Sequence, residues 1–127
     1  MPGKQLYEYS VIRLVPRVER EEFLNIGVIL YVQQLRFLDL RFQVVPERLA
    51  AFSKETDPSE VCRYLHSFSL VCKGGKAAGP IGTLDLPSRF RWLTAVRSTI
   101  VQTSCIHPGL CSDPSAELDR LFQKLVL

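Results

Sequence analysis

The sequence predicts an α+β fold with a mostly antiparallel sheet that is packed by three to four helices. Residues 5–45 hold three β-rich segments joined by short connections, which favours an N-terminal three-stranded antiparallel meander. Helix-start signals and apolar residues at helical spacing dominate the later segments, which contain one further β-rich stretch. The chain has 127 residues and neither repeats nor a linker, so we expect a single domain over residues 1–127.

The first predicted strand, residues 6–16, alternates between two faces. Tyr9 and Arg13 share one face, while Ile12 and Leu14 share the other. Proline has no N–H for the ladder, so we expect Pro16 to end this strand.

The second and third predicted strands cover residues 23–32 and 35–44. The second is almost continuously apolar, which favours a central strand covered on both faces. Gly27 within it indicates a bulge or the close approach of another group. In the third strand, Asp39 and Arg41 lie on the face opposite Leu38, Leu40 and Phe42.

Four later segments are predicted to be helical. Pro46 suits the first turn of a short helix through Phe52. A longer helix follows Asp57, which we expect to be its N-cap, with Glu60 completing a capping box. Ser88 is the predicted cap of a short helix within residues 88–96, and residues 113–114 start the last helix. Between these helices we expect a glycine-rich loop over residues 73–82, a strand over 97–106 and a turn over 107–115.

Charge and hydropathy exclude several classes of function. The formal net charge is +3, which is too mild to indicate a nucleic-acid-binding protein without a clustered basic patch. We find neither an apolar leader nor an apolar stretch long enough to span a bilayer, so we expect a cytoplasmic protein without membrane contact. The four cysteines are then expected to be thiols.

Metal binding and cysteine catalysis are both weakly supported. Cys105, His107 and Cys111, with Cys72 as a fourth candidate, lack the paired knuckles typical of zinc sites. We therefore expect no metal and no cofactor, with buried thiols and a turn histidine instead. Cys105 and His107 are close in sequence, but this says little about a catalytic geometry, so whether the protein is an enzyme stays open.

The arginines are the most informative polar residues. Arg13 lies on an apolar strand face and needs a partner, because an unpaired buried charge is costly. A structural ion pair with Glu22 or Asp39 is the favoured interpretation. The alternative is a basic, aromatic-lined surface that binds an anionic ligand or an acidic partner, formed by arginines such as Arg17, Arg20 and Arg89 beside Trp92.

Three segments carry a family resemblance: YEYSVIRLVPRVEREEFLNIGVILY, GPIGTLDLPSRFRWLTAVRSTIVQTSCIHPGL and DPSAELDRLFQKLVL. In these segments the chain resembles an uncharacterised bacterial domain-of-unknown-function family over nearly its whole length. Cys105 and Pro108 depart from the pattern, where proline and threonine are expected. The family implies no reaction. Its members are often encoded beside a HipA-like kinase, which implies a partner.

From the resemblance and the residues we expect a non-catalytic binding or regulatory partner of a HipA-like kinase, in a toxin–antitoxin-like context. The alternative is an enzyme or binding protein that acts on a phosphorylated or nucleic-acid ligand through an Arg/Gln/His cleft. Oligomeric state stays open. We expect Arg13, Asn25, Arg97 and Gln102 to converge near one end of the sheet, and a polar row of Ser98, Gln102 and Ser104 to face outward. The full set of candidate binding residues is Arg13, Arg17, Asn25, Arg89, Trp92, Arg97, Ser98, Gln102 and His107.

Overall fold

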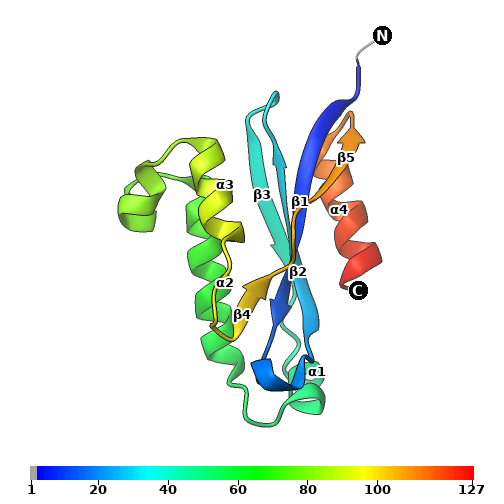
Figure 1. Cartoon of the computed structure of the whole chain (residues 1–127), viewed down its shortest axis with the longest axis vertical. Helices are drawn as coiled ribbons and strands as arrows, with labels where there is room; N and C mark the ends of the chain where they lie inside the picture. Colours follow the sequence, from blue (N-terminus) through cyan, green and yellow to red (C-terminus); the bar gives the residue numbers. More distant parts are fainter. Residues whose placement is uncertain (1–2) are drawn as a thin grey trace.

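The computed structural model describes residues 3–127, apart from the side chain of Val18, and shows a sheet with helices on both faces (Figure 1). The strands are β1 (Gln5–Leu14), β2 (Leu24–Val32), β3 (Phe37–Phe42), β4 (Val101–Thr103) and β5 (His107–Cys111). The α-helices are α1 (Pro46–Phe52), α2 (Pro58–Lys73), α3 (Leu86–Thr94) and α4 (Pro114–Leu125). Two 3-10 segments complete the elements, η1 (Val18–Arg20) and η2 (Lys76–Thr83).

The sheet confirms the predicted α+β class and the N-terminal meander. Its order is β3-β2-β1-β4, and β5 also pairs with β1, so β4 and β5 lie one after the other along the same side of β1. Every strand pair is antiparallel. The short β1–β2 and β2–β3 connections allow this arrangement, because antiparallel neighbours need no long crossover.

Two apolar cores lie on opposite faces of the sheet. Ile29 and Tyr31 of β2 face the core covered by α2 and α3, while Val28 and Leu30 face the core beneath α4. The near-continuous apolar run of β2 therefore fills both cores, as predicted for a central strand. Full burial of one such aliphatic side chain stabilises the fold by about 1.5–3 kcal/mol.

Gly27 marks the predicted irregularity in β2. The register between β1 and β2 shifts after the pair Ile12–Gly27, so that Arg13 lies opposite Asn25 and Ile26 is the extra residue of a bulge. A Cβ on Gly27 would stand 2.7 Å from the Arg41 carbonyl oxygen, so the backbone of β3 also approaches closely here. Both predicted features are confirmed at one position.

Aspartate caps begin three of the helices. Asp57 Oδ1 accepts a hydrogen bond from the Ser59 N–H at 3.0 Å, and Asp113 Oδ1 accepts one from the Ala116 N–H at 3.3 Å, as the sequence predicts. The predicted cap of α3 is wrong. Asp85 caps that helix and accepts from the Ser88 N–H at 3.0 Å, which places Ser88 inside the first turn.

Three predicted segments differ in the structure. The glycine-rich residues 76–83 form the turns of η2 instead of an open loop, and only residues 101–103 of the predicted strand 97–106 are extended in the sheet. The first part of the predicted turn over 107–115 is instead the strand β5. Proline is tolerated at residue 108 because β5 is an edge strand. Ser104 is buried instead of facing outward, and its Oγ accepts the Val11 N–H at 2.9 Å.

The ring of Tyr7 leaves no space for a side chain at residue 109, which is its cross-strand partner between β1 and β5 and is a glycine. A Cβ at residue 109 would lie 2.3 Å from the ring carbon Cζ of Tyr7, whose hydroxyl donates to Glu117 of α4 at 2.7 Å. The ring cannot move without disturbing this bond between the sheet and α4.

We predict that Gly109→Ala lowers the free energy of unfolding by about 1–3 kcal/mol, the usual cost of forcing a group into a packed site. Chemical denaturation measures it, with Gly3→Ala as the control because a Cβ on Gly3 meets no atom within 4 Å. Equal unfolding free energies for the Gly109→Ala variant and the wild-type protein would contradict this packing.

Candidate functional site

Three polar residues from three neighbouring strands stand in one line across the sheet. Arg13 of β1 lies opposite Asn25 of β2 on one side and opposite Gln102 of β4 on the other. Cross-strand partners point to the same face, here the face of α4, since Asn25 Nδ2 donates to the Leu125 carbonyl oxygen at 3.1 Å. We call these three residues the polar row. It lies where β1 ends and β2 begins.

Arg13 lacks the ion pair that the sequence favoured. Its guanidinium carbon lies 4.0 Å from the centroid of the Phe23 ring, and its buried Nε has no hydrogen-bond partner within residues 3–127. The two expected carboxylates bind other arginines: Glu22 pairs with Arg20, and Asp39 pairs with Arg41 at 2.8 Å. In each case the carboxylate forms its ion pair with the arginine two residues away along the chain. Arg13 is left half-buried, with stacking on Phe23 as its main described contact.

The two amides of the polar row have fixed orientations. Asn25 donates from Nδ2 to Leu125, which leaves its buried Oδ1 without a partner in the described chain. Gln102 donates from Nε2 to the Thr99 carbonyl oxygen at 2.9 Å. The row therefore combines an arginine that forms no ion pair within the described residues with two side-chain amides whose NH₂ groups are already bonded. A guanidinium of this kind is suited to a carboxylate or a phosphate.

His107 lies on the same face of the sheet, farther along β1. It is the cross-strand partner of Tyr9, and the two ring centroids are 5.2 Å apart. Cys105 Sγ is 3.5 Å from His107 Nε2. The other two cysteines proposed as metal ligands are buried in different cores, Cys72 in the core beneath α2 and α3 and Cys111 in the core beneath α4. Among residues 3–127 no group of three histidine, cysteine or acidic side chains is placed to hold a metal ion.

Arg97 does not join the polar row, so the predicted convergence of all four residues is wrong. Its guanidinium carbon lies 5.0 Å from the centroids of both Phe68 and Trp92, on the α2–α3 face. It donates to the carbonyl oxygens of Trp92 at 2.6 Å and Leu93 at 3.3 Å, near the C-terminus of α3, and burial lowers the pKa of this guanidinium. Residues 97–100 leave the sheet, so strand alternation does not decide where their side chains point. Ser98 is exposed there.

Arg89 has a structural role. Its Nη1 donates to the carbonyl oxygens of Val71 and Cys72, both at 2.9 Å, and so satisfies acceptors at the C-terminus of α2. The chain leaves that helix through Gly74, where φ is +77° and a Cβ would lie 2.6 Å from Arg89 Nη1. The expected surface of Arg17, Arg20, Arg89 and Trp92 is therefore divided, because Arg89 and Trp92 belong to α3 while Arg17 and Arg20 belong to the β1–β2 connection.

We predict that Arg89→Ala lowers the free energy of unfolding by about 1–3 kcal/mol, since buried carbonyl oxygens lose a charged donor. Thermal or chemical unfolding measures the loss. Arg91→Ala on the same helix is the matched control, because Arg91 is exposed and should be nearly neutral. A similar small effect for both variants would show that Arg89 does not stabilise the end of α2.

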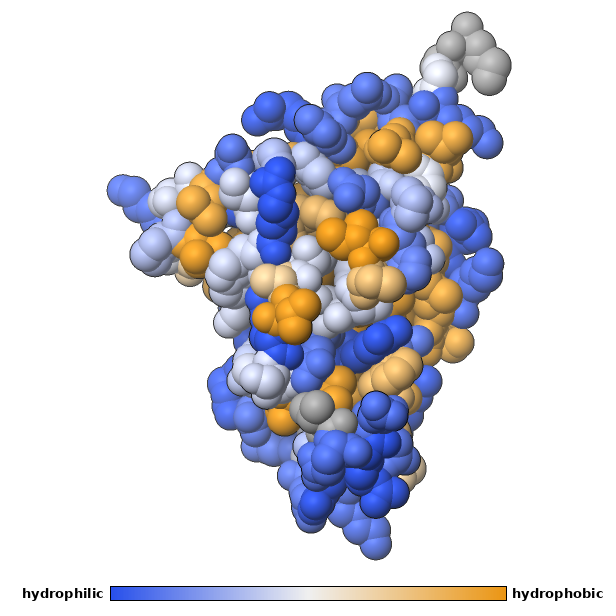
Figure 2. Space-filling model, viewed as in Figure 1, coloured by the Kyte–Doolittle hydropathy of each residue, from blue (hydrophilic) through white to orange (hydrophobic). Residues whose placement is uncertain are grey.

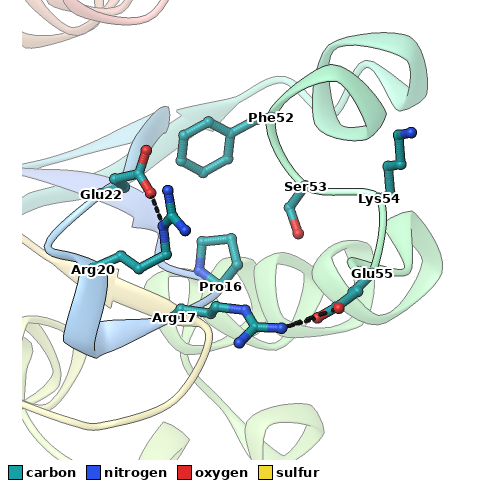
Figure 3. Close-up of a pocket in the computed structure, with 8 residues that line it drawn as sticks. All are labelled: Pro16, Arg17, Arg20, Glu22, Phe52, Ser53, Lys54 and Glu55. Carbon is teal, nitrogen blue, oxygen red and sulfur yellow. Dashed lines mark hydrogen bonds and ion pairs between the residues drawn. The ribbon is translucent and has the colours of Figure 1, made fainter.

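Arg17 lines a cavity of about 260 Å³ at the same end of the sheet as the polar row (Figure 3). One wall comes from the β1–β2 connection and the other from the connection between α1 and α2. We call this cavity the end pocket; it is lined by Pro16, Arg17, Arg20, Glu22, Phe52, Ser53, Lys54 and Glu55. Arg17 Nη2 donates to both carboxylate oxygens of Glu55, at 3.1 and 3.0 Å, which joins the two walls. This end of the molecule is strongly hydrophilic (Figure 2).

The sequence did not indicate Phe23 as the surface on which Arg13 stacks, or residues 52–55 as part of a pocket. An aromatic residue directly after the charged connection was the available signal for Phe23. Residues 52–55 carried no signal, because their part in the end pocket depends on where α1 lies beneath the sheet.

Fold and site together define a small α+β domain whose antiparallel sheet carries an arginine that stacks on an aromatic ring and has no ion pair within the described residues. The chain belongs to the family described as "Protein of unknown function (DUF3037)", whose model matches residues 9–126. This confirms membership of a domain-of-unknown-function family. Searches of curated proteins and of solved structures find no match. Within the described residues, no helix has the length and apolar character needed to cross a membrane.

Proposed function

We propose that the protein is a non-catalytic binding module that holds a carboxylate of a protein partner at the polar row. The observation that carries the proposal is Arg13, which is half-buried and has neither an ion pair nor a hydrogen bond in the described chain. A guanidinium in this state has already lost part of its water shell, so the entry of a carboxylate supplies the charge partner that it lacks.

The surroundings of Arg13 support a protein partner. Phe23 is 46% exposed although Arg13 stacks on its ring, and this leaves aromatic surface for a partner to cover. Arginine and aromatic residues are enriched among the side chains that dominate binding energies at protein interfaces.

The partner we propose is a HipA-like kinase, in a regulatory, toxin–antitoxin-like relationship. This part of the proposal comes from the family resemblance, because such kinases are often encoded beside family members. The proposal includes a cytoplasmic location, since the four cysteines are free thiols, as a reducing compartment would keep them.

A second candidate function is binding of a nucleic-acid ligand on the same face. The neighbouring rings of Tyr9 and His107, tilted by 32° to one another, favour it, because aromatic side chains on a sheet can stack with unpaired bases. The Arg/Gln/His cleft expected from the sequence would then be the strip that runs from Arg13 and Gln102 to His107. This candidate predicts binding of single-stranded oligonucleotides that is lost when Tyr9 is replaced by alanine.

We predict that Arg13→Ala raises the Kd of the complex with a HipA-like kinase encoded beside this protein at least tenfold, or about 1.4 kcal/mol, because the kinase carboxylate loses its cationic partner. Co-purification at low and high salt, followed by calorimetry, measures the change. Arg63→Ala is the control, since Arg63 is an exposed arginine on α2. Arg13→Lys keeps the charge without the flat group that stacks on Phe23, and should show an intermediate loss.

Unfolding measurements on the Arg13 variants separate binding from folding. An unchanged complex with a folded Arg13→Ala protein would overturn the docking site. If no complex forms at either salt concentration and the lone protein binds oligonucleotides, the second candidate replaces the first.

A further inference from the structure

We propose that the end pocket is a binding site for a phosphate monoester, separate from the polar row. The pocket lies between the β1–β2 connection and the α1–α2 connection (Figure 3). It combines two arginines, a serine hydroxyl and a lysine at the rim with an apolar wall. The proposal does not depend on the kinase partner, because it rests on other residues.

The guanidinium groups of Arg20 and Arg17 are held with donors to spare. Arg20 uses Nε for its bond to Glu22, so its two terminal nitrogens stay available on the side of the cavity (Figure 3). Arg17 uses Nη2 for both oxygens of Glu55, which leaves other N–H groups. An arginine has five N–H donors, so one carboxylate does not saturate it. Guanidinium groups oriented in this way match the oxygens of a phosphoryl group.

The carboxylates of Glu22 and Glu55 reduce the positive charge of the pocket, and Glu19 lies 4.0 Å from Arg17. These pairs are exposed, with side-chain exposures of 54% and 75% for Arg17 and Glu55, so water screens them and each contributes little. A phosphate monoester brings almost two negative charges and three acceptor oxygens near neutral pH. It can therefore compete with a single carboxylate for the free donors, while the carboxylates keep the arginines in place.

The apolar wall indicates an ester instead of free phosphate. Phe52 and Pro16 face the cavity beside the arginines, and the Ser53 hydroxyl is directed toward it (Figure 3). The volume of about 260 Å³ far exceeds the share of one water molecule in the liquid, about 30 Å³. There is room for a phosphoryl group together with a small organic group packed on Phe52 and Pro16.

Titration calorimetry with phenyl phosphate and with inorganic phosphate tests the site on the full chain. We expect phenyl phosphate to bind at least threefold more tightly, because only its ring can contact the apolar wall. Arg20→Ala should weaken phenyl phosphate binding at least tenfold. Arg91→Ala, an exposed arginine on α3, should change it less than twofold.

Absence of phenyl phosphate binding to the wild-type protein at millimolar concentrations would overturn the proposal. So would equal binding by a folded Arg20→Ala variant, and equal affinities for the two probes would overturn the preference for an ester. A phosphoserine peptide compared with free phosphoserine identifies the source: tighter peptide binding supports a phosphorylated protein, and equal binding supports a small metabolite. Arg13→Ala should leave all these affinities unchanged, so failure here and failure at the polar row are distinguishable.

Discussion

The domain depends on the pairing of β1 with residues 101–111. β1 forms the middle of the sheet only because β4 and β5 occupy the side that β2 leaves open. The two buried polar residues of the described core, Ser10 and Ser104, lie at the junction of β4 and β5. Ser10 donates to the Ser104 carbonyl oxygen at 2.6 Å, and the Ser104 hydroxyl accepts the Val11 N–H at 2.9 Å. These side chains replace ladder bonds where the edge strand is interrupted, so the backbone of β1 stays satisfied.

This pairing also places the groups that we assign to binding. Gln102 lies opposite Arg13 because β4 is in register with the end of β1, and Asn25 lies opposite it because of the bulge at Ile26. Without that bulge, alternation would turn Asn25 to the other face, away from α4. The polar row is thus a consequence of one register shift and one short edge strand. Arg17 and Arg20 belong to the end pocket instead, because β1 ends at Leu14 and they lie in the connection that follows it.

Local sequence patterns predicted the first three strands and most of the helices, whereas the positions of β4 and β5 depend on their pairing with β1. Alternation over residues 5–45 and the caps Asp57 and Asp113 act within a few residues, so the sequence alone carries them. β5 was not predictable in this way, because its proline and glycine are tolerated only beside β1, with the Tyr7 ring over Gly109. At the candidate site, strand alternation pointed to Arg13 but not to its lack of a carboxylate. Each acid pairs with the arginine two residues away on its own segment, Asp39 with Arg41 and Glu22 with Arg20, and alternation alone does not choose between these arginines and Arg13.

The distance along the chain between β1 and its last partners has a consequence for how the protein is made. During synthesis the meander of β1, β2 and β3 emerges first, with one side of β1 unpaired until residues 101–111 leave the ribosome. An unpaired apolar strand is a template for wrong pairing, and contacts this far apart in sequence close slowly. α4 follows later still in the chain and covers the second face, so Val28 and Leu30 of β2 stay uncovered until residues 114–125 have been made. The nascent domain is therefore most prone to aggregate before residues 101–125 have been made, when a chaperone or an early partner has most to protect.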